Sequence, residues 1–276
     1  MGAGDAAVSA PGGGPAGGDD DARLLALDTA TSTACLVLGD GRGVLIARRD
    51  WRPGHGSVET IIGQLHDLLE EARLEPAALS AIIVGIGPGA FTGLRIGLAT
   101  AKTLAHELDR PIVGIETTAG LALAAWWTLT STAAAGPRTL TSAASGPPRR
   151  ITVVSPAGPG ARYLARYRVS GSGPQRATPT VAPLEAPRLL LPAEVGDGEA
   201  DLVAVDLDGG TAGPVASSAA GRGAAALHGL GAALLVLGTA RLASGGADDV
   251  AALVPTYVSL PRGAPAQGVA WSPDLR

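Results

Sequence analysis

Residues Gly85–Leu108 read "GIGPGAFTGLRIGLATAKTLAHEL" and join a glycine-rich turn directly to a helical pattern. Such a turn can cradle a phosphate, give a helix a sharp start, or let another stretch of backbone come close. Its glycines Gly87, Gly89 and Gly93 are spaced one residue wider than the dinucleotide-binding fingerprint, and no lysine stands where a Walker A loop needs one. The stretch favours a structural use of glycine, with phosphate contact as the open alternative.

The segments on either side of this turn predict an α/β layer. Upstream, "LLALDTA", "TACLVLGDG" and "GVLIARRD" are strand-like and separated by polar turns, which is typical of an antiparallel meander. An amphipathic helix follows from Ser57 to about Arg73. The apolar runs "LSAIIVGIG" and "PIVGIE" flank the helix that ends near Leu108 and predict buried strands. A meander followed by alternating strands and helices indicates a mixed sheet flanked by helices.

Composition divides the chain into four parts. Residues 1–22 are predicted to be a disordered tail, and residues 23–127 to form the first lobe. Residues 128–149 are rich in Thr, Ser, Ala, Gly and Pro and predict a linker or loose loop. Residues 150–276 predict a second, degenerate lobe with strands at "ITVVS", "ARYLARYRV" and "ADLVAVDL". Its late helix, from about Ala224 to Leu242, is expected to pack back on the first lobe.

Charge and cysteine content exclude several classes of protein. The 276-residue chain has a formal net charge of −4 and a pI of about 5.6, so it lacks the basic field that tight nucleic-acid binding needs. With a single cysteine, Cys35, it has no intrachain disulfide, and the cytoplasm is the expected compartment. The N-terminus lacks the features of a signal peptide. The apolar run near Leu234 looks too short and interrupted to span a membrane.

Two short motifs resemble phosphate loops. In "LDTATST", Asp28 ends the first strand and is followed by hydroxyl residues, as in actin-like ATPases, but Ala30 stands where those enzymes have a glycine. Asp28, Thr29 and Thr31 are therefore candidates for weak nucleotide contact, and the alternative is that they hydrogen-bond their own turn. "DLDGGT", Asp206–Thr211, is either a second phosphate loop or an ordinary turn.

Neither a metal site nor a catalytic nucleophile is visible in the sequence. The four histidines never fall in a zinc-binding spacing, and Cys35 lies in an apolar strand without a nearby base.

A stripe of small residues runs along the helix after the glycine turn. Gly93, Gly97, Ala101 and Ala105 recur at every fourth position and so share one face. Small side chains permit close helix approach, either within the protein's own fold or to a helix of a partner. Both interpretations are open from the sequence.

Three motifs together resemble the TsaB (YeaZ) family. They are "LLALDTATSTACLVL", "GPGAFTGLRIGLATAKTLA" and "PIVGIETTAGLA", in the family's order, and they cover roughly Leu24–Trp127. The second half is less similar. "PTYVS" resembles the family's terminal P-x-Y-L-R, but Ser259 replaces the arginine. "SPAGPGARYLARY" departs from the Asp-Ala-Arg segment that many members carry before a Glu-Val-Tyr strand.

The resemblance implies a two-lobed actin-like (ASKHA, RNase H-like) α/β fold. It also implies a role in making threonylcarbamoyladenosine (t6A) in tRNA, as a non-catalytic subunit without catalytic residues or a required cofactor. Family members pair with TsaD, which holds the metal and performs the transfer, and the ATPase TsaE joins that pair. A homodimer is expected when TsaD is absent, and tRNA is expected to bind only through the complex. An adenine nucleotide at the subunit junction is an open alternative.

The resemblance also directs the search for a partner surface. The residues expected there are Ser57, Ile61 and Leu65 on the amphipathic helix, and Gly93, Gly97, Ala101 and Ala105 on the next. The competing function is an active actin-like or sugar-kinase-type ATPase or phosphotransferase, which needs complete phosphate loops. A metallopeptidase fails for want of paired histidines.

Overall fold

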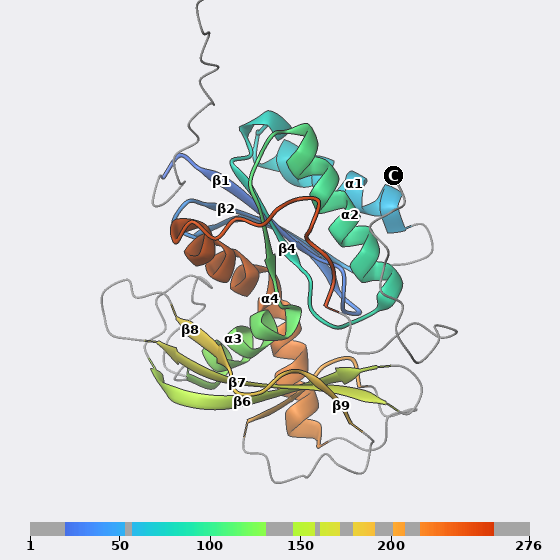
Figure 1. Ribbon diagram of the computed structural model, residues 1–276, viewed down its shortest axis with the longest axis vertical. Coiled ribbons are helices and arrows are strands. Elements are labelled where there is room, and N and C mark those ends of the chain that lie inside the picture. The colour runs from blue at the N-terminus through green and yellow to red at the C-terminus, as the bar shows by residue number, and fades with distance from the viewer. Residues whose placement is uncertain are drawn as a thin grey trace, which may run out of the picture.

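The computed structural model contains two five-stranded sheets with helices between and around them (Figure 1). It describes residues 20–52, 57–130, 146–157, 161–171, 179–190, 201–207 and 216–256. The fold is therefore α/β with mixed sheets flanked by helices, as the sequence and its resemblance predicted.

The first sheet is the predicted meander extended by two parallel strands. Its strands are β1 (Arg23–Asp28), β2 (Ala34–Asp40), β3 (Leu45–Trp51), β4 (Ala81–Gly85) and β5 (Ile112–Ile115), in the order β3-β2-β1-β4-β5. β1 pairs antiparallel with β2 and parallel with β4. Alternate residues of β1 belong to two different cores, Leu24 and Ala26 to one, Leu25 and Leu27 to the other. Both faces of the sheet are thus buried, which explains the continuous apolar run.

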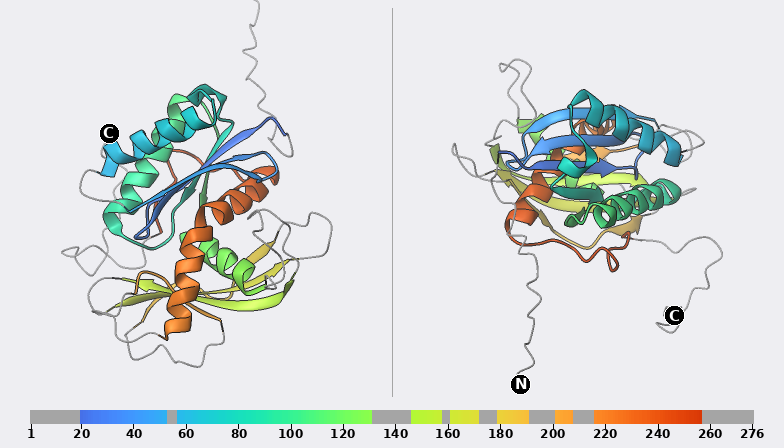
Figure 2. Two further views of the ribbon diagram at one scale, coloured as in Figure 1. Left: turned by 180° about the vertical axis from the view of Figure 1, so that it is seen from behind. Right: turned by 90° about the horizontal axis from the view of Figure 1, so that it is seen from above.

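Each face of the first sheet is covered by a pair of helices. α1 (Ser57–Glu71) and α2 (Phe91–Glu107) cover the outer face, and a short 3-10 turn, η1 (Pro76–Ala78), precedes β4. α3 (Thr117–Thr130) and α4 (Ser217–Ala243) lie on the inner face, between the two sheets (Figure 2). The turn after β1, where the strand ends, is therefore enclosed by helices and sits at the junction of the lobes.

The second sheet is dominated by a long hairpin. β6 (Gly146–Pro156) and β7 (Arg162–Gly171) pair along most of their length, and β10 (Leu202–Ala204) and β8 (Thr180–Pro183) flank them. β9 (Arg188–Leu190) also pairs with β7. The strands predicted at "ITVVS", "ARYLARYRV" and "ADLVAVDL" correspond to β6, β7 and β10.

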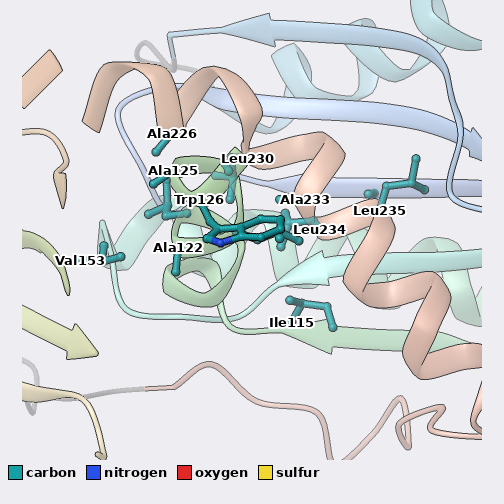
Figure 3. Packing of buried hydrophobic residues seen from close by; sticks show 14 of the residues in the cluster. Ile115, Ala122, Ala125, Trp126, Val153, Ala226, Leu230, Ala233, Leu234 and Leu235 are labelled. Carbon is teal, nitrogen blue, oxygen red and sulfur yellow. The ribbon is translucent and has the colours of Figure 1, made fainter. Parts of the chain in front are cut away.

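One hydrophobic core joins the two lobes. It combines side chains of the first sheet, of α3 and α4, and of β6 and β7. Trp126 of α3 is fully buried in it, packed among alanines and leucines such as Leu230 and Leu234 of α4 (Figure 3). Its indole Nε1–H donates to the carbonyl of Pro147, 3.1 Å away, so the polar atom of this large side chain is satisfied.

The predicted linker is shorter than expected. Thr128–Thr130 continue α3, because the hydroxyls of Thr128 and Thr130 donate to the carbonyls of Ala124 and Trp126 one turn earlier. Gly146–Arg149 already belong to β6, where Arg149 pairs with Val169 of β7. Residues 131–145 of the predicted linker lie outside the described residues.

The late helix is longer than predicted. α4 begins at Ser217, seven residues before Ala224, although "SSAAGRG" has no apolar periodicity. Packing supports this first part, since Ala219 is buried and Gly223 lies against β10. α4 is therefore long and apolar enough to cross a membrane by length and composition alone. Most of it is buried between the lobes, which identifies it as a core helix.

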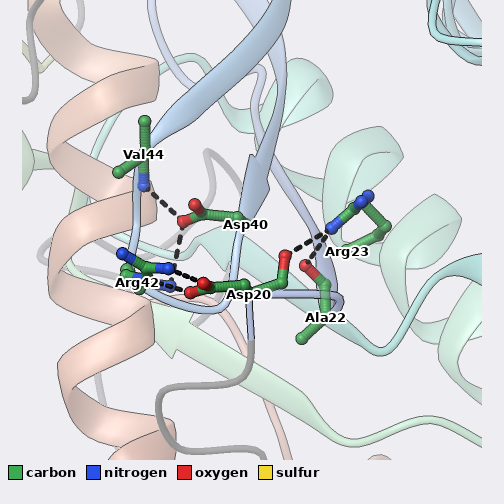
Figure 4. Close-up of polar contacts among 6 residues, drawn as sticks. All are labelled: Asp20, Ala22, Arg23, Asp40, Arg42 and Val44. Carbon is green, nitrogen blue, oxygen red and sulfur yellow. Dashed lines mark hydrogen bonds and ion pairs between the residues drawn. The ribbon is translucent and has the colours of Figure 1, made fainter.

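The predicted tail ends earlier than expected, because Asp20 and Ala22 are held by the first sheet. Asp20 forms an ion pair with Arg42, and the Arg23 guanidinium donates to the carbonyls of Asp20 and Ala22 (Figure 4). Asp40 closes the adjoining β2–β3 turn by accepting hydrogen bonds from the backbone of Arg42 and Val44. Residues 1–19 of the predicted tail lie outside the described residues.

After α4, residues 248–256 run back along the edge strand β5 and form a segment that we call the strap. The amide of Asp248 donates to the carbonyl of Ile112 (2.8 Å), and its carboxylate accepts from the amide of Gly114 (2.8 Å). The amide of Thr256 donates to the carbonyl of Ile86 (2.8 Å). The strap occupies backbone groups that an uncovered edge strand would leave unpaired.

Candidate functional site

The candidate site is the turn that follows β1, at the junction of the two lobes. Asp28, the last residue of β1, is fully buried. Its Oδ1 accepts a hydrogen bond from the amide of Ala30 (2.8 Å), and its Oδ2 accepts one from the hydroxyl of Thr117 (2.6 Å). Burial raises the pKa of Asp28 to about 6, although the two hydrogen bonds oppose that shift. The buried carboxyl group of Asp28 therefore stabilises the turn and ties it to Thr117 of α3.

The hydroxyls beside Asp28 also bond within the chain. Thr29 and Thr31 are both buried. The hydroxyl of Thr29 donates to the carbonyl of Gly93 in α2 (2.6 Å), and that of Thr31 donates to the carbonyl of Thr33 (2.9 Å). Of the two interpretations that the sequence left open for Asp28, Thr29 and Thr31, turn stabilisation describes what the structure contains. Nucleotide contact by these three side chains stays a prediction.

The glycine turn lies directly against the β1 turn. A Cβ atom on Gly89 would stand 2.1 Å from the carbonyl oxygen of Ala30, and one on Gly93 would stand 2.2 Å from that of Thr29. No methyl group fits at these distances. The amide of Ala90 also donates to the carbonyl of Ala30 (2.7 Å). The glycines of Gly85–Leu108 thus allow close approach of one stretch of backbone to another, both belonging to this chain.

The small-residue stripe continues this contact, so its assignment to a partner surface is wrong. Gly97, Ala101 and Ala105 are buried, and a Cβ on Gly97 would stand 2.1 Å from the Thr29 hydroxyl. Gly93, half-buried, meets the same turn. The stripe faces its own core because α2 must lie close enough to the β1 turn to bond Thr29.

Two of the three partner residues predicted on α1 are buried, and the side chain of the third lies outside the described residues. Ile61 and Leu65 are buried, and Leu65 packs in the outer core with Leu68 and Leu69. The side chain of Ser57 lies outside the described residues. The amphipathic pattern of α1 therefore identified the face that covers the sheet, while its solvent face carries Ile62, which is 50% exposed.

A polar crevice of about 310 Å³ opens between the lobes beside this turn. Ser32 of the β1 turn and Asp206, just after β10, lie on its walls together with Asp50, Arg52 and His228. The amide of Ser32 donates to Asp206 Oδ2 (2.7 Å), and its hydroxyl donates to Asp206 Oδ1. This contact links the two phosphate-loop-like motifs of the sequence. The sequence flagged Asp206 within "DLDGGT" but provided no sign that it meets Ser32, because 174 positions separate them.

A second cavity, of about 550 Å³, lies between β5, β8 and α4 and is mainly apolar. Glu116 and Tyr167 line it. Burial raises the pKa of Glu116, whose Oε1 accepts from the Thr256 hydroxyl (2.5 Å). Burial also raises the pKa of Tyr167 to about 12. Sequence reasoning singled out neither residue. Glu116 had a local signal, because it is an acidic residue at the end of the apolar strand "PIVGIE".

Within the residues that the structure describes, no three His, Cys, Asp or Glu side chains gather in a way that could hold a metal ion. Cys35 is buried, and burial raises its pKa well above that of a free thiol. The geometry offers a closed turn, a polar crevice and an apolar cavity.

Comparisons with known proteins match part of the chain in sequence. A family model described as "TsaD: tRNA N6-adenosine threonylcarbamoyltransferase" matches residues 55–158. Over 104 residues the chain is 35% identical to tRNA threonylcarbamoyladenosine biosynthesis protein TsaB of Escherichia coli, a match that covers 38% of this chain and 44% of that protein. It is 36% identical over 99 residues to TsaB of Bacillus subtilis, covering 36% and 43%. The chain thus spans less than half the length of these curated relatives.

The structural comparison extends further along the chain. YeaZ from Pseudomonas aeruginosa superposes with a TM-score of 0.62 and 22% sequence identity, covering 86% of this chain and 99% of that one. This likeness shows a shared fold that includes both lobes. Sequence relatives named TsaB, a YeaZ fold and the three motifs around the β1 turn agree, and together they support assignment of the chain to the TsaB/YeaZ family.

Proposed function

We propose that this protein is a non-catalytic subunit of the bacterial t6A machinery, which pairs with a TsaD-like transferase and supports threonylcarbamoyl transfer to tRNA. Its relatives in two bacteria are named as t6A biosynthesis proteins, and the matched segment runs from α1 through β6. The single observation that carries the non-catalytic role is the state of Asp28. Its carboxylate is fully buried and both oxygens are hydrogen-bonded within the chain.

The solvent side of α1 is the partner surface that we propose. Ile62 is half exposed there, and a methyl group added to the neighbouring Gly63 would have no other group within 4 Å. An exposed isoleucine beside a glycine lets a facing helix approach and bury apolar surface. Phe91, at the start of α2, is exposed as well and carries Arg95 over its ring, 4.3 Å from the centroid. This surface replaces the buried stripe as the expected contact.

The test of pairing is a binding titration with the TsaD-like protein of the same genome. Ile62→Glu should weaken binding by about one to two decades, since burying an isoleucine contributes roughly 1.5–3 kcal/mol. Ile46→Glu is the matched control, because Ile46 is 46% exposed but lies on β3. Equal binding of both variants and the wild type would rule out α1 as the contact. No binding by the wild type, with t6A levels unchanged on depletion of this protein, would overturn the function.

The competing function is ATP hydrolysis or phosphoryl transfer by the chain alone. We expect phosphate release in the presence of magnesium to stay at the buffer rate, because Asp28 is not open to solvent. Turnover above buffer that Asp28→Ala abolishes would favour this alternative. An adenine nucleotide bound at the junction with TsaD is compatible with either outcome, because it requires no catalysis by this chain.

The remaining associations follow from the same proposal. A TsaE-like ATPase is expected to join the pair, and a homodimer to form when TsaD is absent. The net charge of −4 supports tRNA binding through the complex only. An electrophoretic shift of tRNA by the chain alone, at submicromolar concentration and physiological salt, would contradict this. A role in tRNA modification fits a location in the cytoplasm.

A further inference from the structure

The contact between Ser32 and Asp206 joins the two lobes across the polar crevice. Ser32 belongs to the turn between β1 and β2, and Asp206 follows β10 of the second sheet. Both oxygens of the Asp206 carboxylate are engaged, Oδ2 by the Ser32 amide at 2.7 Å and Oδ1 by the Ser32 hydroxyl. An amide and a hydroxyl aimed at one carboxylate make a two-point oxyanion site. In this chain the anion in that site is a side chain of the protein itself.

The backbone at Asp206 is held in an uncommon conformation. Its φ is 55°, in the left-handed region that costs energy for residues other than glycine, although aspartate tolerates it better than most. The conformation brings the carboxylate onto the β1 turn. The same feature makes a clean experiment available, because glycine adopts this φ without strain and removes only the side chain.

The crevice around the contact has groups of both signs. Arg52 and His228 line it, and Asp50 lies on the same wall. Asp50 is paired with Arg48, whose guanidinium also contacts His228 Nδ1 at 3.0 Å. Removal of Asp206 would leave the Ser32 donors, Arg52 and His228 facing a space of about 310 Å³. That arrangement suits a phosphate-type oxyanion, free or at the end of a nucleotide.

We propose that Asp206 is a latch that occupies an oxyanion site on Ser32, and that it thereby ties the lobes together and excludes phosphate groups from the crevice. The latch is independent of any partner protein. It assigns a role to both phosphate-loop-like motifs, since one provides the donors and the other the internal anion. Phosphate is excluded because the Ser32 amide and hydroxyl are already bonded to Asp206, and because the Asp206 carboxylate repels a second anion.

The experiment is calorimetric titration of inorganic phosphate, ADP and adenosine into the full chain. Asp206→Gly should bind phosphate and ADP at least tenfold more tightly than the wild type, and adenosine no more tightly, because adenosine has no oxyanion. Adding Ser32→Ala to Asp206→Gly should abolish the gain. Asp50→Ala is the matched control, since it removes one carboxylate from the same crevice and leaves Ser32 bonded to Asp206.

Two results would overturn the latch. One is an equal gain in Asp206→Gly and Asp50→Ala, which would mean that only the overall charge of the crevice matters. The other is no gain in Asp206→Gly. Amide hydrogen exchange gives a second readout, because the Ser32 amide should exchange at least tenfold faster in Asp206→Gly than in the wild type. If Asp206→Gly fails to fold, Asp206→Asn keeps the shape and removes the charge, and a phosphate affinity equal to that of the wild type would then sink the proposal.

Discussion

Each of the two lobes is stabilised internally by a different kind of packing. In the first lobe, α2 lies so close to the β1 turn that Gly89, Gly93 and Gly97 leave no space for a methyl group. In the second, the hairpin of β6 and β7 packs by ordinary burial of apolar side chains. The family model ends at residue 158, whereas the structural match to YeaZ covers 86% of the chain. The two kinds of packing place different demands on the sequence, because close backbone approach requires glycine, while an apolar strand needs only a pattern.

The largest expected effect breaks the contact in the first lobe. Gly97→Leu should destabilise the folded protein by about 3 kcal/mol, because overpacking forces α2 away from Thr29. Chemical denaturation of the chain alone measures this. Gly63→Leu on the open side of α1 is the control and should leave stability equal or slightly higher, because leucine favours helix more than glycine does. If Gly97→Leu is as stable as the wild type, the stripe does not pack in the core, and its assignment as a partner surface would be restored.

The second prediction concerns the charge buried in the same contact. The pKa of Asp28 is raised from 3.8 to about 6 in the folded state, so the folded protein binds this proton more tightly than the unfolded chain does. The resulting stabilisation is present below pH 4 and is lost as the pH rises through 6. The wild type should lose roughly 2 kcal/mol from this group between pH 4 and pH 7, at about 1.4 kcal/mol per pKa unit. Asp28→Asn should remove that part of the pH dependence. An identical profile in unfolding titrations of the two proteins would contradict the assignment.

The third prediction concerns a close backbone contact at the second sheet, and it tests the contrast between the lobes. Gly223 of α4 is the candidate, because a Cβ there would stand 1.7 Å from the carbonyl oxygen of Ala204 in β10. Gly223→Ala should cost roughly 1–2 kcal/mol, even though alanine favours helix. Gly221→Ala, two residues earlier in open space, should be neutral or stabilising. If both variants melt alike, α4 can shift away from β10 at little cost, and the close contact that matters for stability is confined to the first lobe.

The smallest effect is expected at the strap, which runs along the edge strand β5 of the first sheet. Lys102, the only lysine of the chain, donates from Nζ to the carbonyls of Ala251 and Leu253, both at 3.1 Å. Lys102→Met should cost less than about 1 kcal/mol, because these bonds are partly exposed to water. Hydrogen exchange at residues 248–256 should nevertheless speed up. Thr103→Met, on the exposed side of α2, is the comparison. Unchanged exchange would mean that Asp248 and Thr256 hold the strap alone.

Local pattern was sufficient for most of the elements. Alternation and apolar runs identified β1 to β5, α1 and α2, because their side chains repeat with the period of the element. The same reasoning began α4 seven residues late, because "SSAAGRG" becomes helical through its contact with β10 and not through periodicity. It also placed residues 128–130 in the linker, although Thr128 and Thr130 bond back to the preceding turn and continue α3.

The candidate site could be predicted only in part. Asp28, Thr29 and Thr31 were found because an acidic residue followed by hydroxyls at a strand end is a local signal. Their direction was not predictable, since Thr29 turns to Gly93 and Asp28 to Thr117, both distant in the chain. Ser32 was not singled out, because its partner Asp206 lies in the other lobe.

By itself, the sequence determined the mixed α/β first lobe, the close helix contact of its glycine-rich helix and the resemblance to the TsaB family. Those properties depend on residue type and spacing along the chain. Only the tertiary structure decided which backbone the glycines meet, that the stripe from Gly93 to Ala105 faces inward, and that Asp206 reaches Ser32. A periodic pattern defines a face of a helix but not the neighbour of that face, because the neighbour is brought there by packing of segments far apart in the chain.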